Sequence, residues 1–371
     1  MDKLIGRTVS FINGLSSIVN LNTPFVRYQG NPILSPCDVN EVWTDPGLQV
    51  ITVHNAGVIE LGEETLMLFR SHLRSGISVL GVARSRNGLN NWHIDSTPFI
   101  KPATKSDWFD NKSNRAALIL NESGGVEDPR ITKIDDFYAI TYSAYHGSIK
   151  NRVRVSLATT KDFSSVKRYG PMLDQDMRNV VIFPEKIDGK YTALFRPNDT
   201  TEGDTGGSYT QIKLGYTENL EYGNWQISTD PLLKTGSGPS AFSDKIGPGA
   251  PPIKTKKGWL NIFHGVRSTM DGNPYVLGVA LHDLSDPGKV KMSSIPILFP
   301  SREDCSVDRS DYIHVPNVVF TCGATRRSDG SILIYYAGND TVMNVGITHE
   351  DVLIGLCENY GQNPVTGELL Y

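Results

Sequence analysis

The residues of this chain that are best suited to chemistry are two adjacent carboxylates and a scattered group of cations. Glu127 and Asp128 stand side by side in the segment GGVEDPR, and a positioned carboxyl group can act as a general acid. The cations include two arginines eighteen residues apart, together with a lysine and a histidine: Arg178, Arg196, Lys245 and His264. Because the planar fork of arginine binds two oxygens at once, such a group favours a phosphate-sized anion.

These residues are far apart in sequence, so the fold must bring them together. Five segments share one pattern, in which a short apolar strand, a polar turn and an alternating second strand follow one another: 54–70, 127–143, 179–197, 248–265 and 316–338. The turns carry residues such as Asp188-Gly189, which are typical of β-hairpins. The pattern therefore predicts five hairpins.

A third strand with its own polar turn follows each of the first four hairpins, at 80–94, 155–169, 212–227 and 276–292. Equivalent positions recur every 54 to 72 residues, which is typical of propeller blades with three or four strands each. We predict an all-β fold, a five-bladed β-propeller over residues 31–371 with an N-terminal arm over 1–30 that closes the ring or extends to a neighbouring subunit. A pair of β-sandwich domains is the alternative.

The inner strands of a propeller run along its central channel, so equivalent positions of different blades converge on one axis. The repeats place Asn55 and Asp128 at the start of first strands, and they place Arg70, Arg196 and His264 at the end of second strands. Further candidates lie next to blades three, four and five: Arg178, Lys245 and Asp340. Several cations near one axis repel one another unless an anion neutralises them, which supports a phosphate site beside Asp128.

Side chains alternate between the two faces of a strand, so Glu127 and Asp128 are expected to point in opposite directions. The alignment with Asn55 favours Asp128 as the residue that faces the channel, with Glu127 to the side. Arg130 is expected to pair with one of the two acids. A purely structural ion pair at the start of a strand explains the same tetrapeptide.

Composition excludes several classes of function. The chain of 371 residues has a net charge of −4 and no run of basic residues, which argues against nucleic acid as a partner. It has no apolar stretch of the roughly 18 residues that a membrane span needs, and its N-terminus does not read as a signal peptide. Four scattered cysteines and eight histidines without metal spacing predict a cytoplasmic protein without a metal site or cofactor. The sequence is compatible with a homo-oligomer.

Several motifs together resemble glycoside hydrolase family 130, the β-mannoside phosphorylases and related mannosidases, which are five-bladed propellers. The resemblance runs in the family's order over most of the chain: HNAGV, VEDPR, RNVVIFPEKIDGKY with FRP, KIGPGAPPI, GWLNIFHG, VPNVVF and YYAGNDT. It implies that Asp128 is the general acid and that Arg178, Arg196, Lys245 and His264 hold inorganic phosphate as the co-substrate. It also implies that the bound mannose contacts Asn55, Arg70 and Asp340, and we add Glu127 to these substrate-binding candidates.

The implied reaction is the phosphorolysis of a β-mannoside with inversion, to α-mannose 1-phosphate and a shortened acceptor sugar. A phosphorylase needs an acid but no base, because phosphate is already an anionic nucleophile, whereas an inverting hydrolase ordinarily needs both. To be protonated near neutral pH, Asp128 should have a raised pKa, caused by burial or by Glu127. In the family, the proton is thought to pass through a hydroxyl group of the mannose.

Some residues depart from the family pattern and leave alternatives. Many members specific for 1,4 linkages carry tyrosine and arginine where this chain has Glu127 and Glu185, which favours the branch with β-1,2-mannoside enzymes. An inverting β-mannosidase with Glu185 as the base is one rival, and a non-catalytic sugar-binding propeller is another. Four aromatic residues are available to stack on sugar rings or to fill the blade cores: Trp43, Tyr145, Trp225 and Tyr275.

Overall fold

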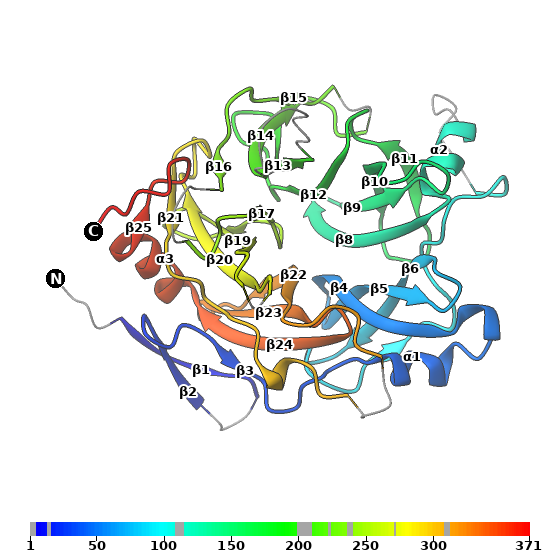
Figure 1. The fold of residues 1–371 in the computed structure, drawn as a ribbon, viewed down its shortest axis with the longest axis horizontal. Coiled ribbons are helices and arrows are strands. Elements are labelled where there is room, and N and C mark those ends of the chain that lie inside the picture. Colours follow the sequence, from blue (N-terminus) through cyan, green and yellow to red (C-terminus); the bar gives the residue numbers. More distant parts are fainter. Residues whose placement is uncertain are drawn as a thin grey trace.

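The computed structural model describes residues 5–12, 16–107, 115–198, 210–221, 224–235, 240–270, 272–307 and 312–371. Within these ranges, β-strands dominate, and five antiparallel sheets stand around a common axis (Figure 1). The predicted five-bladed β-propeller is confirmed by this arrangement.

The first three blades follow the chain from the axis outward. Blade 1 consists of β4 (Val50–Leu61), β5 (Glu64–Leu73), β6 (Ser78–Ser85) and β7 (His93–Ile94). Blade 2 consists of β8 (Gly125–Ile134), β9 (Phe137–Tyr145), β10 (Val153–Thr160) and β11 (Lys167–Pro171). Blade 3 consists of β12 (Met177–Ile182), β13 (Tyr191–Pro197), β14 (Gln211–Thr217) and β15 (Gln226–Ile227), with β16 (Leu233–Lys234) beside β14.

The last two blades include strands from the two ends of the chain. Blade 4 consists of β17 (Lys245–Pro248), β18 (Ile253–Lys254), β19 (Trp259–Val266), β20 (Tyr275–His282), β21 (Val290–Ser293) and the C-terminal β25 (Gly361–Gln362). Blade 5 consists of β22 (Val319–Arg326), β23 (Ser331–Gly338), β24 (Val342–His349) and the N-terminal β3 (Val26–Arg27). Because β3 pairs with β24, the N-terminal region contributes the outer strand of the last blade and so joins the ring.

The remaining elements lie outside the blades. A separate hairpin of β1 (Gly6–Ser10) and β2 (Ser16–Asn20) precedes the ring. In the described ranges, the helical elements are α1 (Pro36–Val42), α2 (Arg115–Glu122), α3 (Glu350–Asn359) and two short 3₁₀ turns, η1 (Pro46–Leu48) and η2 (Arg302–Asp304). Ser35 caps α1 in a reciprocal pair with Asp38, as the capping-box pattern dictates. In the part of the chain that is described, no helix has the length and apolar character that crossing a membrane requires.

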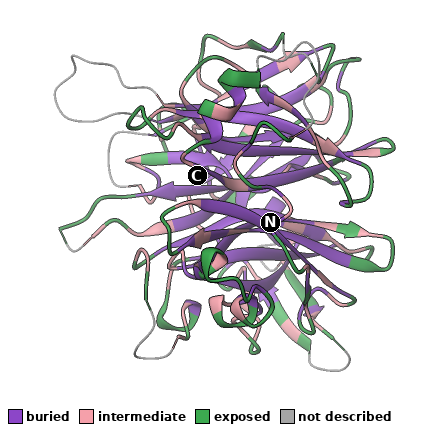
Figure 2. Ribbon diagram, turned by 90° about the vertical axis from the view of Figure 1, so that its right-hand side faces the viewer, coloured by how far each residue is buried: buried purple, intermediate pink, exposed green. Residues whose placement is uncertain are grey.

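The blades hold together by packing their faces against one another. Their strands are buried over most of their length, whereas the turns between them are exposed (Figure 2). The apolar clusters lie mainly between neighbouring sheets, as in the group that joins Leu66 and Leu68 of blade 1 to Ile131 and Ile140 of blade 2. Each blade is thus stabilised by its neighbours, and the inner strands are held in place around the axis.

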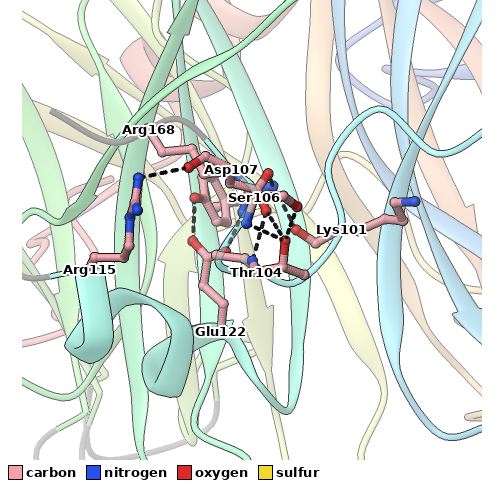
Figure 3. A network of polar contacts seen from close by, with 9 residues as sticks. Lys101, Thr104, Ser106, Asp107, Arg115, Glu122 and Arg168 are labelled. Carbon is pink, nitrogen blue, oxygen red and sulfur yellow. Dashed lines mark hydrogen bonds and ion pairs between the residues drawn. The ribbon is translucent and has the colours of Figure 1, made fainter.

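A buried polar network fixes the outer edge of blade 2 (Figure 3). Arg168 on β11 forms an ion pair with Glu122 on α2 and donates to the carbonyl of Lys101 at 2.7 Å. Tyr142 donates to the other carboxylate oxygen of Glu122 at 2.6 Å. Because both Glu122 and Arg168 are almost fully buried, removing either partner alone is expected to cost roughly 3–5 kcal/mol of stability.

Candidate active site

A cavity of about 1040 Å³ opens on the propeller axis, where the inner strands of the blades begin. Eight of the nine predicted site residues line it: Asn55, Arg70, Asp128, Arg178, Arg196, Lys245, His264 and Asp340. The ninth, Glu127, contacts the cavity residue Arg70. The fold therefore brings residues from all five blades together, as the repeat alignment predicts.

Bulges in the inner strands aim the polar side chains at the axis. The pairing of β4 with β5 shifts between His54 and Gly57, and that of β8 with β9 shifts between Glu127 and Arg130. The residue inside each bulge has a left-handed backbone, with φ of 48° at Asn55 and 51° at Asp128. Asn and Asp tolerate this conformation better than other side chains.

The third blade repeats this device with a residue that sequence reasoning missed. The pairing of β12 with β13 shifts between Arg178 and Val181, and Asn179 has φ of 56°. Asn179 lines the cavity, and its buried side-chain oxygen has no hydrogen-bond partner among the described residues. The sequence contains a signal for this residue. Arg178-Asn179 stands at the start of its repeat, where His54-Asn55 and Glu127-Asp128 stand in the first two repeats.

Arg70 joins the two adjacent carboxylates. Its Nη1 donates to Asp128 Oδ1 at 3.0 Å, and its Nη2 donates to Glu127 Oε1 at 2.7 Å. Asn55 donates to the same Asp128 oxygen at 2.8 Å, and the hydroxyl of Ser78 donates to Glu127 Oε1 at 2.9 Å. The expectation that the two acids point in opposite directions is wrong, because the bulge at Asp128 interrupts the alternation of the strand.

The expected raised pKa of Asp128 is also wrong. Burial alone would raise this pKa, but Arg70 and Arg130 together with the hydrogen bond from Asn55 lower it below its ordinary value. The pKa values of two nearby carboxyl groups are raised instead. Burial raises the pKa of Glu127 despite Arg70, and burial, with the charges of Asp128 and Glu127, raises the pKa of Asp340 to about 7. In the free protein, Asp340 is thus a carboxyl group that binds a proton near neutral pH.

The opposite wall of the cavity is positively charged. Arg178 and Arg196 face each other directly across the β12–β13 pair, and in the described ranges neither forms an ion pair with a carboxylate. Burial and the neighbouring Arg178 lower the pKa of Arg196 to about 10. Such mutual repulsion is relieved when an anion binds between the two guanidinium groups.

Lys245 and His264 extend this wall. Lys245 Nζ donates to the hydroxyl of Tyr275 at 3.3 Å, and the ring of His264 stacks near that of Tyr275. Burial, followed by the charges of Arg196, Arg130 and Lys245, holds the pKa of His264 well below its usual range. His264 is therefore neutral in the free protein, and it presents a polar ring nitrogen, rather than a fourth positive charge, to an anion.

The candidate aromatic residues divide into two pairs. Trp43 and Trp225 are buried in blade cores, at 2% and 6% exposure. Tyr275 lines the cavity, and the ring of Tyr145 lies 5.1 Å from the guanidinium carbon of Arg178. Of these four residues, Tyr275 is the one that lines the cavity, and Tyr145 contacts the cavity residue Arg178.

The outer rim of the cavity holds charged residues that the sequence did not single out. Arg154 pairs with Asp174 and Asp176, and all three line the cavity. Glu185, the base of the alternative hydrolytic reaction, instead lies on the exposed surface in an ion pair with Lys254 and does not line the cavity.

Comparison with known proteins places the whole propeller in one family. Residues 27–359 match the model of glycoside hydrolase family 130, which is described as beta-1,4-mannooligosaccharide phosphorylase. A 1,2-beta-oligomannan phosphorylase of Thermoanaerobacter sp. (strain X514) is 34% identical, over 86% of this chain and 96% of its own length. A beta-1,2-mannobiose phosphorylase of Listeria innocua serovar 6a is 29% identical, over 85% of this chain and 94% of its own length.

A solved structure supports the same conclusion. The beta-1,2-mannobiose phosphorylase from Listeria innocua, in complex with beta-1,2-mannobiose, superposes with a TM-score of 0.72 at 27% identity. The superposition covers 90% of this chain and 99% of that one. The likeness thus extends over all five blades.

Proposed function

Because the chain belongs to glycoside hydrolase family 130 and is a glycoside phosphorylase, we propose that it cleaves β-mannosides by inverting phosphorolysis. The products are α-mannose 1-phosphate and a shortened acceptor sugar. The observation that carries this proposal is the division of the cavity into two walls. Asp128 lies in a carboxylate cluster on one wall, and Arg178, Arg196, Lys245 and His264 form the other.

In the proposed reaction, phosphate lies against Arg178 and Arg196 and attacks the anomeric carbon of the mannose. The bond from that carbon to the glycosidic oxygen breaks, and a bond to a phosphate oxygen forms on the opposite face. The departing oxygen takes up the proton that originates on Asp128, directly or through a hydroxyl of the mannose. No base is required, because the nucleophile is already an anion.

The lowered pKa of Asp128 in the free protein is compatible with this role. Its causes are the charges of Arg70 and Arg130 and the hydrogen bond from Asn55, which prevail over burial. A phosphate dianion in the same cavity adds negative charge, and a bound sugar displaces water from Asp128. Both changes disfavour the carboxylate form, so we propose that Asp128 becomes an acid only when both substrates are bound.

The proposed substrate has a β-1,2 linkage. Glu127 stands directly before Asp128, where many family members with 1,4 specificity carry tyrosine. Its carboxylate is held by Arg70 and Ser78 at the edge of the cavity, so this position differs in shape and charge from a tyrosine. The two relatives described above are named for 1,2-linked mannosides, which supports the same choice.

The test incubates the purified protein with β-1,2-mannobiose and with β-1,4-mannobiose, each with and without inorganic phosphate. Mannose 1-phosphate and free mannose are both measured over time. We expect mannose 1-phosphate to form from the 1,2-linked sugar only when phosphate is present. Equal release of free mannose without phosphate would identify a hydrolase, and inactivity on both sugars would overturn the β-mannoside assignment.

A further inference from the structure

Arg130 is a buried arginine next to the candidate acid, and it takes no part in the cavity walls described above. It lies two residues after Asp128 on β8 and is 1% exposed. Its Nη1 donates to the main-chain carbonyl of Asp128 at 2.8 Å, and its Nε donates to the carbonyl of Gly249 at 3.2 Å. The expectation that Arg130 pairs with a carboxylate side chain is therefore wrong, because its hydrogen bonds go to the main chain.

Such surroundings are unusual for a fully buried charge. Buried arginines are ordinarily paired with a carboxylate, because an unpaired charge in the interior is costly. Among the described residues, Arg130 forms no ion pair, its Nη2 has no hydrogen-bond partner, and its guanidinium carbon lies 5.7 Å from the ring centre of Phe320. The cost of burying this charge indicates that the charge has a use at this position.

The first use follows from the hydrogen bonds. Asp128 has a left-handed backbone inside the bulge of β8, and the bond from Arg130 holds the carbonyl of that same residue. The second bond reaches Gly249, which follows β17 of blade 4 and is itself bonded to β19. Arg130 therefore joins blade 2 to blade 4 behind Asp128 and fixes the peptide group that sets the direction of its carboxylate.

The packing around this link leaves little freedom. A Cβ atom on Gly57 of blade 1 would lie 2.8 Å from the carbonyl oxygen of Pro129, and one on Gly249 would lie 2.6 Å from the carbonyl oxygen of Ile262. Real Cβ atoms do not approach backbone so closely, so both positions require glycine. Three blades thus meet at the residues flanking Arg130.

The second use follows from the charge. Phe320, which the guanidinium of Arg130 faces, also packs against His264 with ring centres 4.5 Å apart. The charge of Arg130 contributes to lowering the pKa of His264, after burial and Arg196. Arg130 therefore adds a permanent positive charge beneath the wall that binds the anion, without lining the cavity itself.

We propose that Arg130 is a positioning residue that aims Asp128 through its backbone and strengthens phosphate binding from below the cavity. This proposal rests on the proposed phosphorolysis. The two effects are separable, because lysine keeps the charge but cannot make both directed hydrogen bonds, whereas methionine keeps only the bulk.

The test compares Arg130→Lys and Arg130→Met with a control at Arg168. Arg168 is an arginine of the same blade, is 3% exposed and bonds Glu122 at the outer edge (Figure 3), and it does not line the cavity. For the natural protein and each variant, we measure kcat, KM for phosphate, the pH dependence of kcat and the midpoint of thermal unfolding. The sugar is the mannobiose that the natural protein cleaves.

For Arg130→Lys, we expect kcat to fall by about ten- to a hundredfold, the size of effect that misplacing a reacting group by about 1 Å produces. Its KM for phosphate changes little. For Arg130→Met, we expect the same fall in kcat and a rise of KM for phosphate of about tenfold, as for a lost interaction of ordinary size. Arg130→Met also moves the alkaline limb of the kcat profile to higher pH, because Arg130 contributes to lowering the pKa of Asp128. Arg168→Lys changes only the unfolding midpoint.

Two results would overturn the proposal. One is a folded Arg130→Lys with unchanged kcat. The other is an Arg130→Met whose KM for phosphate and pH profile match those of Arg168→Lys. If Arg130→Met does not fold, Arg130→Lys still decides the positioning role through kcat. Failure of the proposed function is recognised separately, since the natural protein would then form no mannose 1-phosphate.

Discussion

Asn55 and Asp128 occupy equivalent bulges of neighbouring inner strands, and the amide of Asn55 donates to Asp128 Oδ1 at 2.8 Å. Both residues have a left-handed backbone, so the same local distortion turns a short polar side chain toward the axis in both blades, as it does at Asn179 in blade 3. The bulge of blade 2 contains the aspartate, and the bulge of blade 1 contains the asparagine whose amide binds it. The candidate acid is thus oriented by the fold's own repeat.

Replacing Asp128 with asparagine should abolish most of the phosphorolysis. Asparagine keeps the shape and still accepts from Arg70, but it carries no proton to give, so kcat with mannobiose should fall by about 10²–10⁴-fold. With 4-nitrophenyl β-mannoside, whose leaving group needs little protonation, the loss should be smaller. The rates are measured from mannose 1-phosphate and from nitrophenol release.

The control for this change is Asp136→Asn. Asp136 lies in the turn between β8 and β9 with an 81% exposed side chain, so its removal should leave both rates unchanged. If the kcat of Asp128→Asn fell by the same factor with mannobiose and with 4-nitrophenyl β-mannoside, Asp128 would not be the general acid.

Phosphate should stabilise the protein through Arg178 and Arg196. Binding to the folded state raises the unfolding midpoint in proportion to the logarithm of phosphate concentration, and Arg178→Met should remove most of this gain. Without phosphate, the same variant should unfold at an equal or higher temperature, because Arg178 repels Arg196 and adds to the effect of burial, and these two causes lower the pKa of Arg196 to about 10. Thermal unfolding at several phosphate concentrations measures both effects.

The matched control is Arg84→Met in blade 1. Arg84 pairs with Asp95 at 2.5 Å outside the cavity. Removing the Arg84 guanidinium should leave the phosphate-dependent rise of the unfolding midpoint unchanged. An undiminished gain in Arg178→Met would show that phosphate binds elsewhere.

His264 should bind phosphate as a neutral side chain in the free protein. Burial and the nearby cations hold its pKa well below the usual range, so lowering the pH from about 8 to about 6 should not charge it before phosphate binds. We expect His264→Asn to raise KM for phosphate by a similar factor throughout this range. The measurement is KM for phosphate against pH for both proteins, and two curves that diverge below about pH 6.5 would show that His264 gains a charge there.

Asp340 should make stability decrease with rising pH. Its pKa is raised to about 7 in the folded state, mainly by burial, against about 3.9 in the unfolded chain. The folded state therefore binds more protons between these values. The stabilisation is complete below about pH 4 and is lost as pH rises through about 7.

Asp340→Asn remains neutral at every pH and isolates this effect. The difference in unfolding midpoint between the variant and the natural protein should grow in favour of the variant from about pH 4 to about pH 7 and then level off. Thermal unfolding across this range, with Asp136→Asn as the exposed control, measures it. A difference independent of pH would mean that Asp340 stays ionised.

Local patterns in the amino-acid sequence are sufficient to predict the number of blades and the residue types of the cavity. Strand alternation and hairpin turns such as Asp188-Gly189 are local properties, so five repeats of them predict five sheets without knowledge of contacts. A propeller then brings equivalent positions to one axis, which is why the repeats alone are enough to group Asn55, Arg70 and Asp128.

The hydrogen bonds and the protonation of these residues, in contrast, depend on contacts between segments far apart in the sequence. The bulge that turns Glu127 and Asp128 toward Arg70 depends on pairing with β9. Burial by neighbouring blades raises the pKa of both Asp128 and Asp340, and the charges of Arg70 and Arg130 with the hydrogen bond from Asn55 bring the pKa of Asp128 below its ordinary value. The same holds for Arg130, whose partner Gly249 is 119 residues away. Long-range packing and desolvation leave no periodic trace in a sequence, because they arise between segments that only the closed ring brings into contact.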